Sequence, residues 1–385
     1  MKPFTPRRDF ITSALGTFGT IGTFGTFGSL GALAPWGPAL SAQPSGSAQE
    51  NSFYPAVKPR ALIFPQDHGA HPDYRTEWWY LTGWLGEGRD AMGFQLTFFR
   101  SKTQHPSDNP SRLAPKQLLF AHAALSNPQE DRYLHANRSG RLSGTRLSAA
   151  VSDTALQFDD WALHRLSNAS EETYEGQFAG EGFAVSFKAS THELPLLRGH
   201  GGVSPKGPQA QHSSYYYSRA PLAVNAQVKL GPRTQSMQGV AWLDHEWSSQ
   251  VLMPGAVGWD WLGINLLGGG TLMAFQIRNA QAQALYAQVD ARDRQGQPRQ
   301  DWRRLRWIGG GPWRSKSLIE YPIPMNLELD GVVYRLEPLM LAQEVDARTS
   351  TGGFYWEGAV CLMQGDKRLG FGYLELTGYG APLNV

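Results

Sequence analysis

The chain has 385 residues, of which 41% are hydrophobic, 12% aromatic and 18% charged, enough for two domains with cores of their own. Three basic residues and one acidic residue lie within residues 1–42, so 32 of each sign remain in the rest of the chain. This balance, without any run of Lys or Arg, excludes binding to nucleic acids or to an acidic membrane surface through a basic patch. The single cysteine excludes an internal disulfide.

Residues 1–42 are typical of an export signal. The paired arginines of PRRDFIT precede a long charge-free stretch of Gly, Phe, Thr, Leu and Ala, and small residues follow at Ala39, Ser41 and Ala42. The arginine pair favours the twin-arginine pathway, so we expect a periplasmic or secreted protein. An uncleaved membrane anchor is the alternative. Beyond this signal no apolar segment reaches about 18 residues, so no stable membrane span is expected once it is removed.

The rest of the chain is predicted to be all-β. Residues 43–54 are rich in Ser, Gln and Asn and predict a disordered leader. From Pro55 onward, short segments of alternating polarity are separated by Gly, Pro, Asn and Asp, and no long helical stripe occurs. We expect an N-terminal domain over residues 55–234 and a C-terminal domain over 235–385. Each would be an antiparallel β-barrel, the two packed together.

One hairpin pattern occurs twice in these two domains. A tryptophan-rich strand, HPDYRTEWWYLTGWL (71–85), is followed by GFQLTFFR (93–100), and WDWLGINLL (259–267) is followed by AFQIR (274–278). This repetition predicts the same β-hairpin in two related modules.

Further motifs surround the hairpins: FAHAALSN, SYYYSR, GVAWLDHEWSSQ, YPIP, YWEGAV and GYLELTGY. Together they resemble the AttH and carotenoid 1,2-hydratase family of lipocalin-like proteins, from His68 to the C-terminus. The resemblance implies two lipocalin-like antiparallel β-barrels and a buried pocket for an apolar isoprenoid or lipid. It leaves the activity open, because the family combines carotenoid hydratases and related enzymes with exported members often encoded beside ABC transporters.

Three residues are the expected catalytic set, because the positions matching His245, Trp247 and Asp260 are tied to catalysis in the hydratases. Strand alternation places His245 and Trp247 on one face and Asp244 and Glu246 on the other. Hydrating an alkene needs an acid, shelter for a carbocation, and a water molecule. A carboxyl group among aromatic rings has a raised pKa, which suits Asp260 as the acid. Trp247 would stabilise the cation and His245 would orient or deprotonate the water.

A structural role is the alternative for these residues, since an Asp between tryptophans and a DHEW motif can both be buried hydrogen-bonding groups. Residues expected to bind the substrate are Trp259 and Trp261 beside Asp260, Glu77 and Tyr80 in the first hairpin, and Tyr216 and His200 as a lid.

Glu77 also has a structural alternative, an ion pair with Arg75 or Arg100. His68 and His71 lack further metal ligands at a telling spacing, so no metal is expected, and no cofactor either. The absence of a GxSxG motif or a Cys-His pairing argues against a serine or thiol hydrolase.

Two functions are therefore expected. The first is an exported, carotenoid 1,2-hydratase-like enzyme that adds water to, or rearranges, an apolar isoprenoid or lipid-type substrate by cofactor-free acid–base chemistry. The second is a non-catalytic periplasmic lipocalin-like carrier of a lipid or hydrophobic metabolite, in the service of an ABC transporter. They differ in whether His245 and Asp260 converge on the pocket or are hydrogen bonded to the barrel walls.

Overall fold

The computed structural model describes residues 54–383, apart from 107, 112–113, 169–170, 251 and 300. The expected export signal (1–42) and residues 43–53 of the expected leader lie outside the described residues. All described residues belong to one compact unit, Asn51–Val385. Among them, no helix combines the length and apolar character needed to cross a bilayer.

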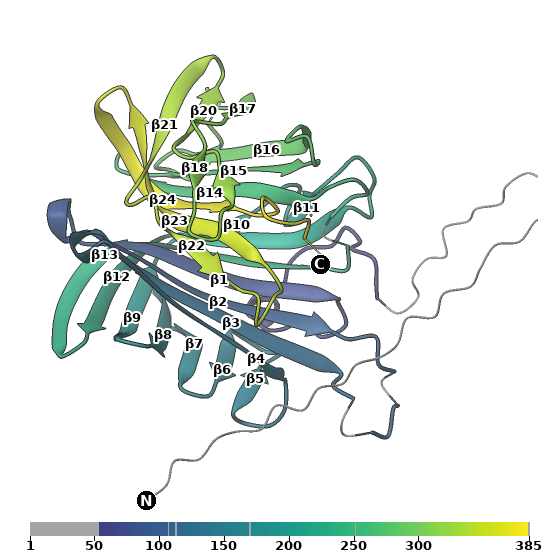
Figure 1. The fold of residues 1–385 in the computed structure, drawn as a ribbon. Helices are drawn as coiled ribbons and strands as arrows, with labels where there is room; N and C mark the ends of the chain where they lie inside the picture. Colours follow the sequence, from purple (N-terminus) through teal and green to yellow (C-terminus); the bar gives the residue numbers. More distant parts are fainter. Residues whose placement is uncertain are drawn as a thin grey trace, which may run out of the picture. The chain divides into compact units, whose positions relative to one another are not determined.

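The prediction of an all-β protein is confirmed. The described residues form 24 strands, and their helices are three short 3-10 segments, η1 (Gln66–His68), η2 (Gly88–Asp90) and η3 (Pro128–Glu130). The strands form two antiparallel sheets that curl into nearly closed barrels (Figure 1), and a separate two-stranded ribbon.

The first barrel is a 13-stranded sheet in the order β4-β3-β2-β1-β13-β12-β9-β8-β7-β6-β5, with β10 and β11 also paired to β12. Its strands are β1 (Thr76–Leu85), β2 (Met92–Lys102), β3 (Gln117–Asn127), β4 (Arg132–Arg141), β5 (Leu147–Ala149), β6 (Ala155–Phe158), β7 (Trp161–Ser167), β8 (Glu172–Gly180), β9 (Phe183–Thr191), β10 (Leu196–Leu197), β11 (Val203–Pro205), β12 (Ser213–Leu230) and β13 (Arg233–Ser248).

The second barrel is a 9-stranded sheet in the order β16-β15-β14-β24-β23-β21-β20-β17, with β22 paired to β23. Its strands are β14 (Gly258–Leu266), β15 (Thr271–Arg278), β16 (Ala284–Arg292), β17 (Leu305–Ile308), β20 (Met325–Leu329), β21 (Val332–Pro338), β22 (Glu344–Asp346), β23 (Phe354–Gln364) and β24 (Lys367–Leu376). The ribbon pairs β18 (Trp313–Arg314) with β19 (Glu320–Tyr321).

The chain passes from the first sheet to the second between residues 249 and 257, and not at the expected boundary after residue 234. The reason is that β12 and β13 form one long hairpin, closed by the pair Leu230 and Arg233. From Gly239 to Ser248, β13 also pairs with β1, with Leu85 opposite Gly239 and Thr76 opposite Ser248. The DHEW motif therefore belongs to the first barrel.

Both predicted hairpins are present. β1 pairs with β2, with Trp79 opposite Phe98, and β14 pairs with β15, with Trp261 opposite Phe275. The segment between β9 and β12 is partly ordered as β10 and β11, which both pair with β12.

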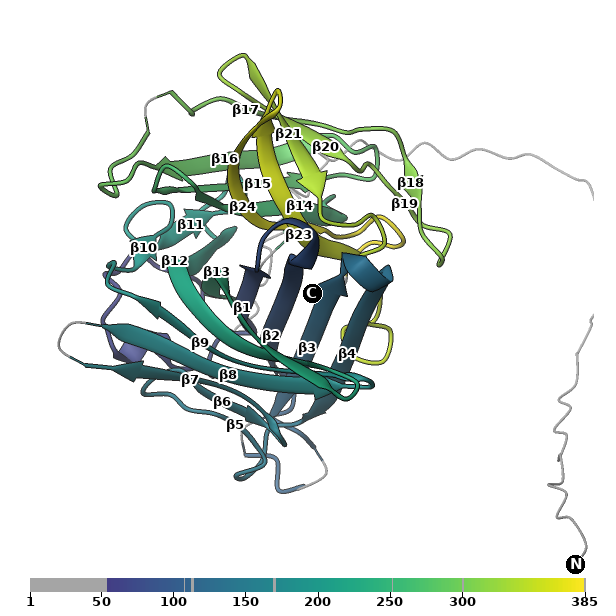
Figure 2. The same ribbon diagram turned by 90° about the vertical axis from the view of Figure 1, so that its left-hand side faces the viewer.

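Strands in the middle of both sheets are buried on both faces. On β1, Trp79, Leu81 and Leu85 pack into the interior of the first barrel, whereas Tyr80 and Trp84 belong to a cluster shared with the second sheet. On β23, Trp356 packs inside the second barrel and Ala359 in the shared cluster. The outer faces of the two barrels thus pack together, in the arrangement that Figure 2 shows from the side.

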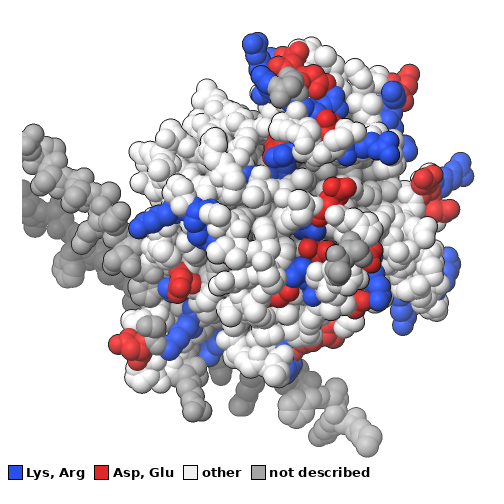
Figure 3. Space-filling model, turned by 180° about the vertical axis from the view of Figure 1, so that it is seen from behind, with Lys and Arg blue, Asp and Glu red and all other residues white. Residues whose placement is uncertain are grey.

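Charged residues of both signs are interspersed on the face seen in Figure 3. No patch of one sign stands out there, as expected for a chain with balanced charge.

Candidate active site

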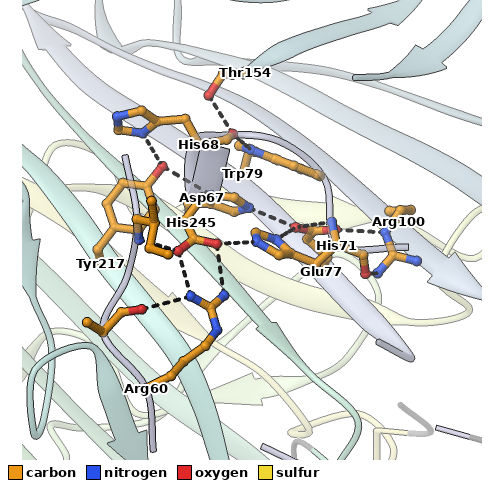
Figure 4. A network of polar contacts seen from close by, with 12 residues as sticks. Arg60, Asp67, His68, His71, Glu77, Trp79, Arg100, Thr154, Tyr217 and His245 are labelled. Carbon is orange, nitrogen blue, oxygen red and sulfur yellow. Dashed lines mark hydrogen bonds and ion pairs between the residues drawn. The ribbon is translucent and has the colours of Figure 1, made fainter. Parts of the chain in front are cut away.

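An extensive polar network lies inside the first barrel, around the fully buried Glu77 of β1 (Figure 4). Its Oε1 accepts hydrogen bonds from His71 Nδ1 (2.7 Å) and His245 Nε2 (2.9 Å), and its Oε2 accepts one from Arg100 Nε (2.7 Å). Burial raises the pKa of Glu77, but the charge of Arg100 and the histidine hydrogen bonds hold it well below the ordinary range. The Arg100 alternative for Glu77 is the one observed.

His71 is partly buried and lies between two carboxylates. Its Nδ1 meets Glu77 and its Nε2 meets Asp67 Oδ1 at 2.9 Å, so both ring nitrogens donate to carboxylates. Burial lowers the pKa of His71, but the hydrogen bonds to Asp67 and Glu77 raise it more. Arg60 in turn neutralises Asp67 through a bidentate pair at 2.7 and 2.8 Å.

His245 is held as a neutral ring by the same network. Because its Nε2 donates to Glu77, its Nδ1 accepts from the Tyr217 hydroxyl at 3.1 Å. That hydroxyl in turn accepts from His68 Nδ1 at 2.7 Å. Burial lowers the pKa of His245 to about 4, against a smaller opposing effect of Glu77. Both ring nitrogens of His245 are therefore occupied by protein groups.

The side chains of His245 and Trp247, which were predicted to share one strand face, lie close together, with their ring centres 4.8 Å apart. The ring of His71 stacks on that of Trp247 at a centre distance of 3.7 Å. Trp247 Nε1 is buried without a hydrogen-bond partner.

The network includes three groups that could hold a metal ion, since ligand atoms of His71, Glu77 and His245 lie within 4.8 Å of one another. A metal would have to displace the protons that both histidines donate to Glu77, and Arg100 already neutralises that carboxylate. The arrangement fits a hydrogen-bonded network better than a metal centre.

This network predicts how stability depends on pH. The carboxyl groups of Asp67 and Glu77 have lowered pKa values. The stability that they contribute is therefore present above their ordinary pKa values near 4 and is lost as the pH falls. The pKa of His71 is raised, so its contribution is complete below about 6.5 and is lost as the pH rises through the raised value. Urea unfolding of wild type and His71→Gln from pH 5 to 9 should give a stability difference that shrinks toward high pH. His164→Gln, on the exposed side of β7, should give no such trend.

Asp260 lies in a separate network inside the second barrel. It accepts hydrogen bonds from Gln276 Nε2 (2.6 Å), Arg278 Nε (2.9 Å) and the Tyr379 hydroxyl (3.1 Å). Burial raises its pKa against the opposing charge of Arg278. Asp260 and His245 share no hydrogen-bond partner among the described residues, and the layer between the barrels separates their interiors.

That layer is the inter-sheet interface, which we define as the outer faces of β1, β2, β3, β12 and β13 together with those of β14, β15, β23 and β24. Here the structure places four of the predicted substrate-binding residues. Trp261 Nε1 donates to the Tyr216 hydroxyl at 3.0 Å, and the ring of Trp261 meets Tyr80 edge-on at 5.1 Å. Trp259 Nε1 donates to Glu375 Oε2 at 2.8 Å. His200 is exposed in the β10–β11 turn and joins none of them.

Buried acids are abundant at this interface. Asp244 accepts hydrogen bonds from the Tyr216 hydroxyl (2.5 Å) and Trp242 Nε1 (2.7 Å), and burial raises its pKa to about 6. Glu246 is neutralised by Lys206 at 3.0 Å.

The two most unusual acids are Glu357 and Glu375, which the sequence analysis missed. They lie directly opposite each other on β23 and β24, and Glu357 is 1% exposed. Neither oxygen of Glu357 has a hydrogen bond of good geometry, although Tyr80, Tyr355 and Gln95 approach it. Burial and the neighbouring carboxyl raise the pKa of Glu357, and burial also raises that of Glu375. The pair therefore keeps a proton near neutral pH.

A signal for this pair was present in the sequence. Glu357 and Glu375 lie in the motifs YWEGAV and GYLELTGY, and each is the only charged residue of its motif. A charged residue at such a position is seldom buried without a function or a partner.

Comparison with known proteins agrees with this fold. The model of the AttH-like family matches residues 55–379. A crystal structure from Nitrosomonas europaea assigned to AttH is 37% identical, with a TM-score of 0.75 over 84% of this chain and 99% of that one. The chain belongs to the AttH-like family.

A more distant likeness shows the fold alone. The crystal structure of kievitone hydratase from Nectria haematococca is 11% identical to this AttH-like chain, with a TM-score of 0.61 over 83% of this chain and 94% of that one. A search of curated proteins returned no match.

Proposed function

We propose that this AttH-like protein is a hydratase that adds water to a carbon–carbon double bond of a hydrophobic substrate, by acid–base catalysis without a cofactor. The observation that carries the proposal is the Glu357–Glu375 pair, in which Glu357 is buried, has no hydrogen bond of good geometry and has a raised pKa. A carboxylic acid kept neutral in an aromatic environment is the kind of acid that protonating carbon requires.

The reaction balances with these groups. The O–H of Glu357 gives its proton to one alkene carbon, which forms a C–H bond and leaves a cation on the more substituted carbon. The indole of Trp261, which lies against Tyr80, stabilises that cation through its ring face. A water oxygen then bonds to the cation and releases a proton to the carboxylate pair, so the acid is restored.

Membership of the AttH-like family and the fold shared with kievitone hydratase support hydratase chemistry. The arginine pair in residues 1–42 supports export by the twin-arginine pathway and work in the periplasm.

The test is lipid extraction and native mass spectrometry of protein purified from its own periplasm. Wild type should carry a product heavier than its precursor by one water, and Glu357→Gln should carry the precursor. Asp260→Asn is the comparison variant, because the Asp260 carboxylate already accepts hydrogen bonds from Gln276, Arg278 and Tyr379. If Asp260→Asn carries the precursor and Glu357→Gln the product, the acid is Asp260 and our assignment is wrong.

A non-catalytic carrier of a lipid or hydrophobic metabolite, delivering to an ABC transporter, is the second candidate. It is favoured by the way His245 and Asp260 are hydrogen bonded within their own barrels. The same unmodified lipid on wild type and on both variants would select the carrier.

A further inference from the structure

A large open groove runs over the outer face of the first barrel. It has a volume of about 1600 Å³ and is lined by residues of β6, β7, β8, β9, β12 and β13. A second hollow of about 330 Å³ continues it, and Gln177, Ser186 and Gln227 line both. The larger volume exceeds the range of about 300–1,000 Å³ that is usual for small-molecule sites, so the groove has room for a chain-like ligand.

The two hollows meet at a row of residues that are paired directly across six neighbouring strands. We call it the polar row, and in the order β13, β12, β9, β8, β7 and β6 its members are Ser236, Gln227, Ser186, Gln177, Ala162 and Gln157. Their neighbours along the strands, such as Val228 and Phe187, pack inside the barrel, so the row lies on the outer face. Five strand spacings of about 4.8 Å give the row a length of about 24 Å along the sheet.

The polar row carries no charge, and its amide groups have fixed orientations. Gln227 Nε2 donates to Ser236 Oγ at 2.7 Å, and Gln177 Nε2 donates to the main-chain oxygen of Asp160 at 2.9 Å. Gln157 Nε2 likewise donates to the main chain. The Oε1 atoms of these three glutamines receive no hydrogen bond from any described residue, so they remain as acceptors on the groove surface.

Acceptors that alternate with hydroxyl groups suit a ligand with many hydroxyl groups of its own. A ligand hydroxyl can donate to a glutamine Oε1 and accept from the hydroxyl of the neighbouring serine. A saccharide offers such hydroxyl groups on consecutive carbon atoms. At one end of the groove the partly buried ring of Phe371, packed against Trp84 with ring centres 4.7 Å apart, supplies an apolar surface for the C–H groups of a sugar.

Charge and backbone pairing argue against two other classes of ligand. The acids Glu87, Asp90 and Glu175 line the larger groove against one cation, Lys188, which already pairs with Glu175 at 2.5 Å. An anionic ligand would therefore be repelled. A peptide that binds by strand addition needs a free sheet edge, whereas the six strands of the row are each paired on both sides.

We infer that this groove is a second binding site, for a neutral oligosaccharide that lies across the strands along the polar row. The site goes beyond the proposed hydratase and does not depend on it, because the row lies on the outer face of the first barrel whereas Glu357 and Glu375 belong to β23 and β24 of the second sheet.

The experiment is isothermal titration calorimetry of the purified protein with three neutral hexasaccharides, maltohexaose, cellohexaose and chitohexaose. At least one of them should bind with a Kd below about 1 mM. Raising the salt concentration from about 0.05 to about 0.5 M should leave that Kd within about twofold, because the ligand carries no charge to screen. The double variant Gln177→Ala/Gln227→Ala, which removes two acceptors, should weaken the binding about tenfold.

The double variant Gln281→Ala/Gln295→Ala is the matched control, because both glutamines are exposed in turns that flank β16 of the second sheet. It should bind the hexasaccharide as wild type does. Three outcomes would each overturn the inference: binding of none of the probes, equal affinities of the two double variants, or a heparin hexasaccharide that binds as tightly as the best neutral probe. A protein that carries a hydrated product but binds no oligosaccharide would overturn this inference alone and leave the hydratase standing.

Discussion

Replacing Glu77 with alanine should lower the free energy of unfolding by about 3–5 kcal/mol, the range for breaking a buried ion pair. The substitution leaves the buried guanidinium of Arg100 and the imidazolium of His71 without their shared carboxylate, and His245 loses the acceptor for its Nε2. Urea denaturation at neutral pH measures the loss.

Glu175→Ala is the matched control for Glu77→Ala. Glu175 also pairs with a cation across two strands, Lys188 at 2.5 Å, but the lysine side chain is 69% exposed. Exposed pairs contribute less than about 1 kcal/mol. A Glu77→Ala protein no less stable than this control would show that the network does not stabilise the first barrel.

Glu357→Gln should change the pH dependence of stability as well as the chemistry. Because the pKa of Glu357 is raised in the folded protein, the stability it contributes is present at low pH and is lost as the pH rises through the raised value. Wild type should lose up to about 1.4 kcal/mol per pH unit for this one proton. The glutamine variant, which has no proton to lose there, should show a flatter profile.

The measurement is urea unfolding of both proteins from pH 5 to 9. Glu337→Gln, on the exposed side of β21, should follow wild type. Parallel profiles for wild type and Glu357→Gln would mean that Glu357 is ionised at neutral pH, and the acid role would then fail with it.

The all-β fold and its two hairpins were predictable from the sequence, because alternation and turn residues act locally. The domain boundary was not predictable from the sequence. Residue 234 lies beside a tight turn, and a turn looks the same whether the next strand stays in the sheet or leaves it. Only the pairing of β13 with β1, over 150 residues apart, assigns the DHEW motif to the first barrel.

The candidate site was only partly predictable for a similar reason. Alternation separates His245 from Asp244, and the structure places them on opposite faces of β13. Alternation alone does not distinguish the face inside the barrel from the face at the inter-sheet interface, because both faces are buried. The motifs predicted Asp260 as the acid, but its carboxylate is hydrogen bonded to three side chains. They did not indicate Glu357, whose surroundings depend on how the two sheets pack.

The two hairpins also share a chemical detail. Glu77 on β1 pairs with Arg100 on β2, and Asp260 on β14 pairs with Arg278 on β15, each inside its own barrel. The two pairs differ in register, because Glu77 lies directly opposite Arg100 whereas Asp260 lies opposite Gln276, two residues before Arg278. Each buried acid is nevertheless neutralised by a cation of its own hairpin, so neither ion pair depends on the packing of the two barrels against each other.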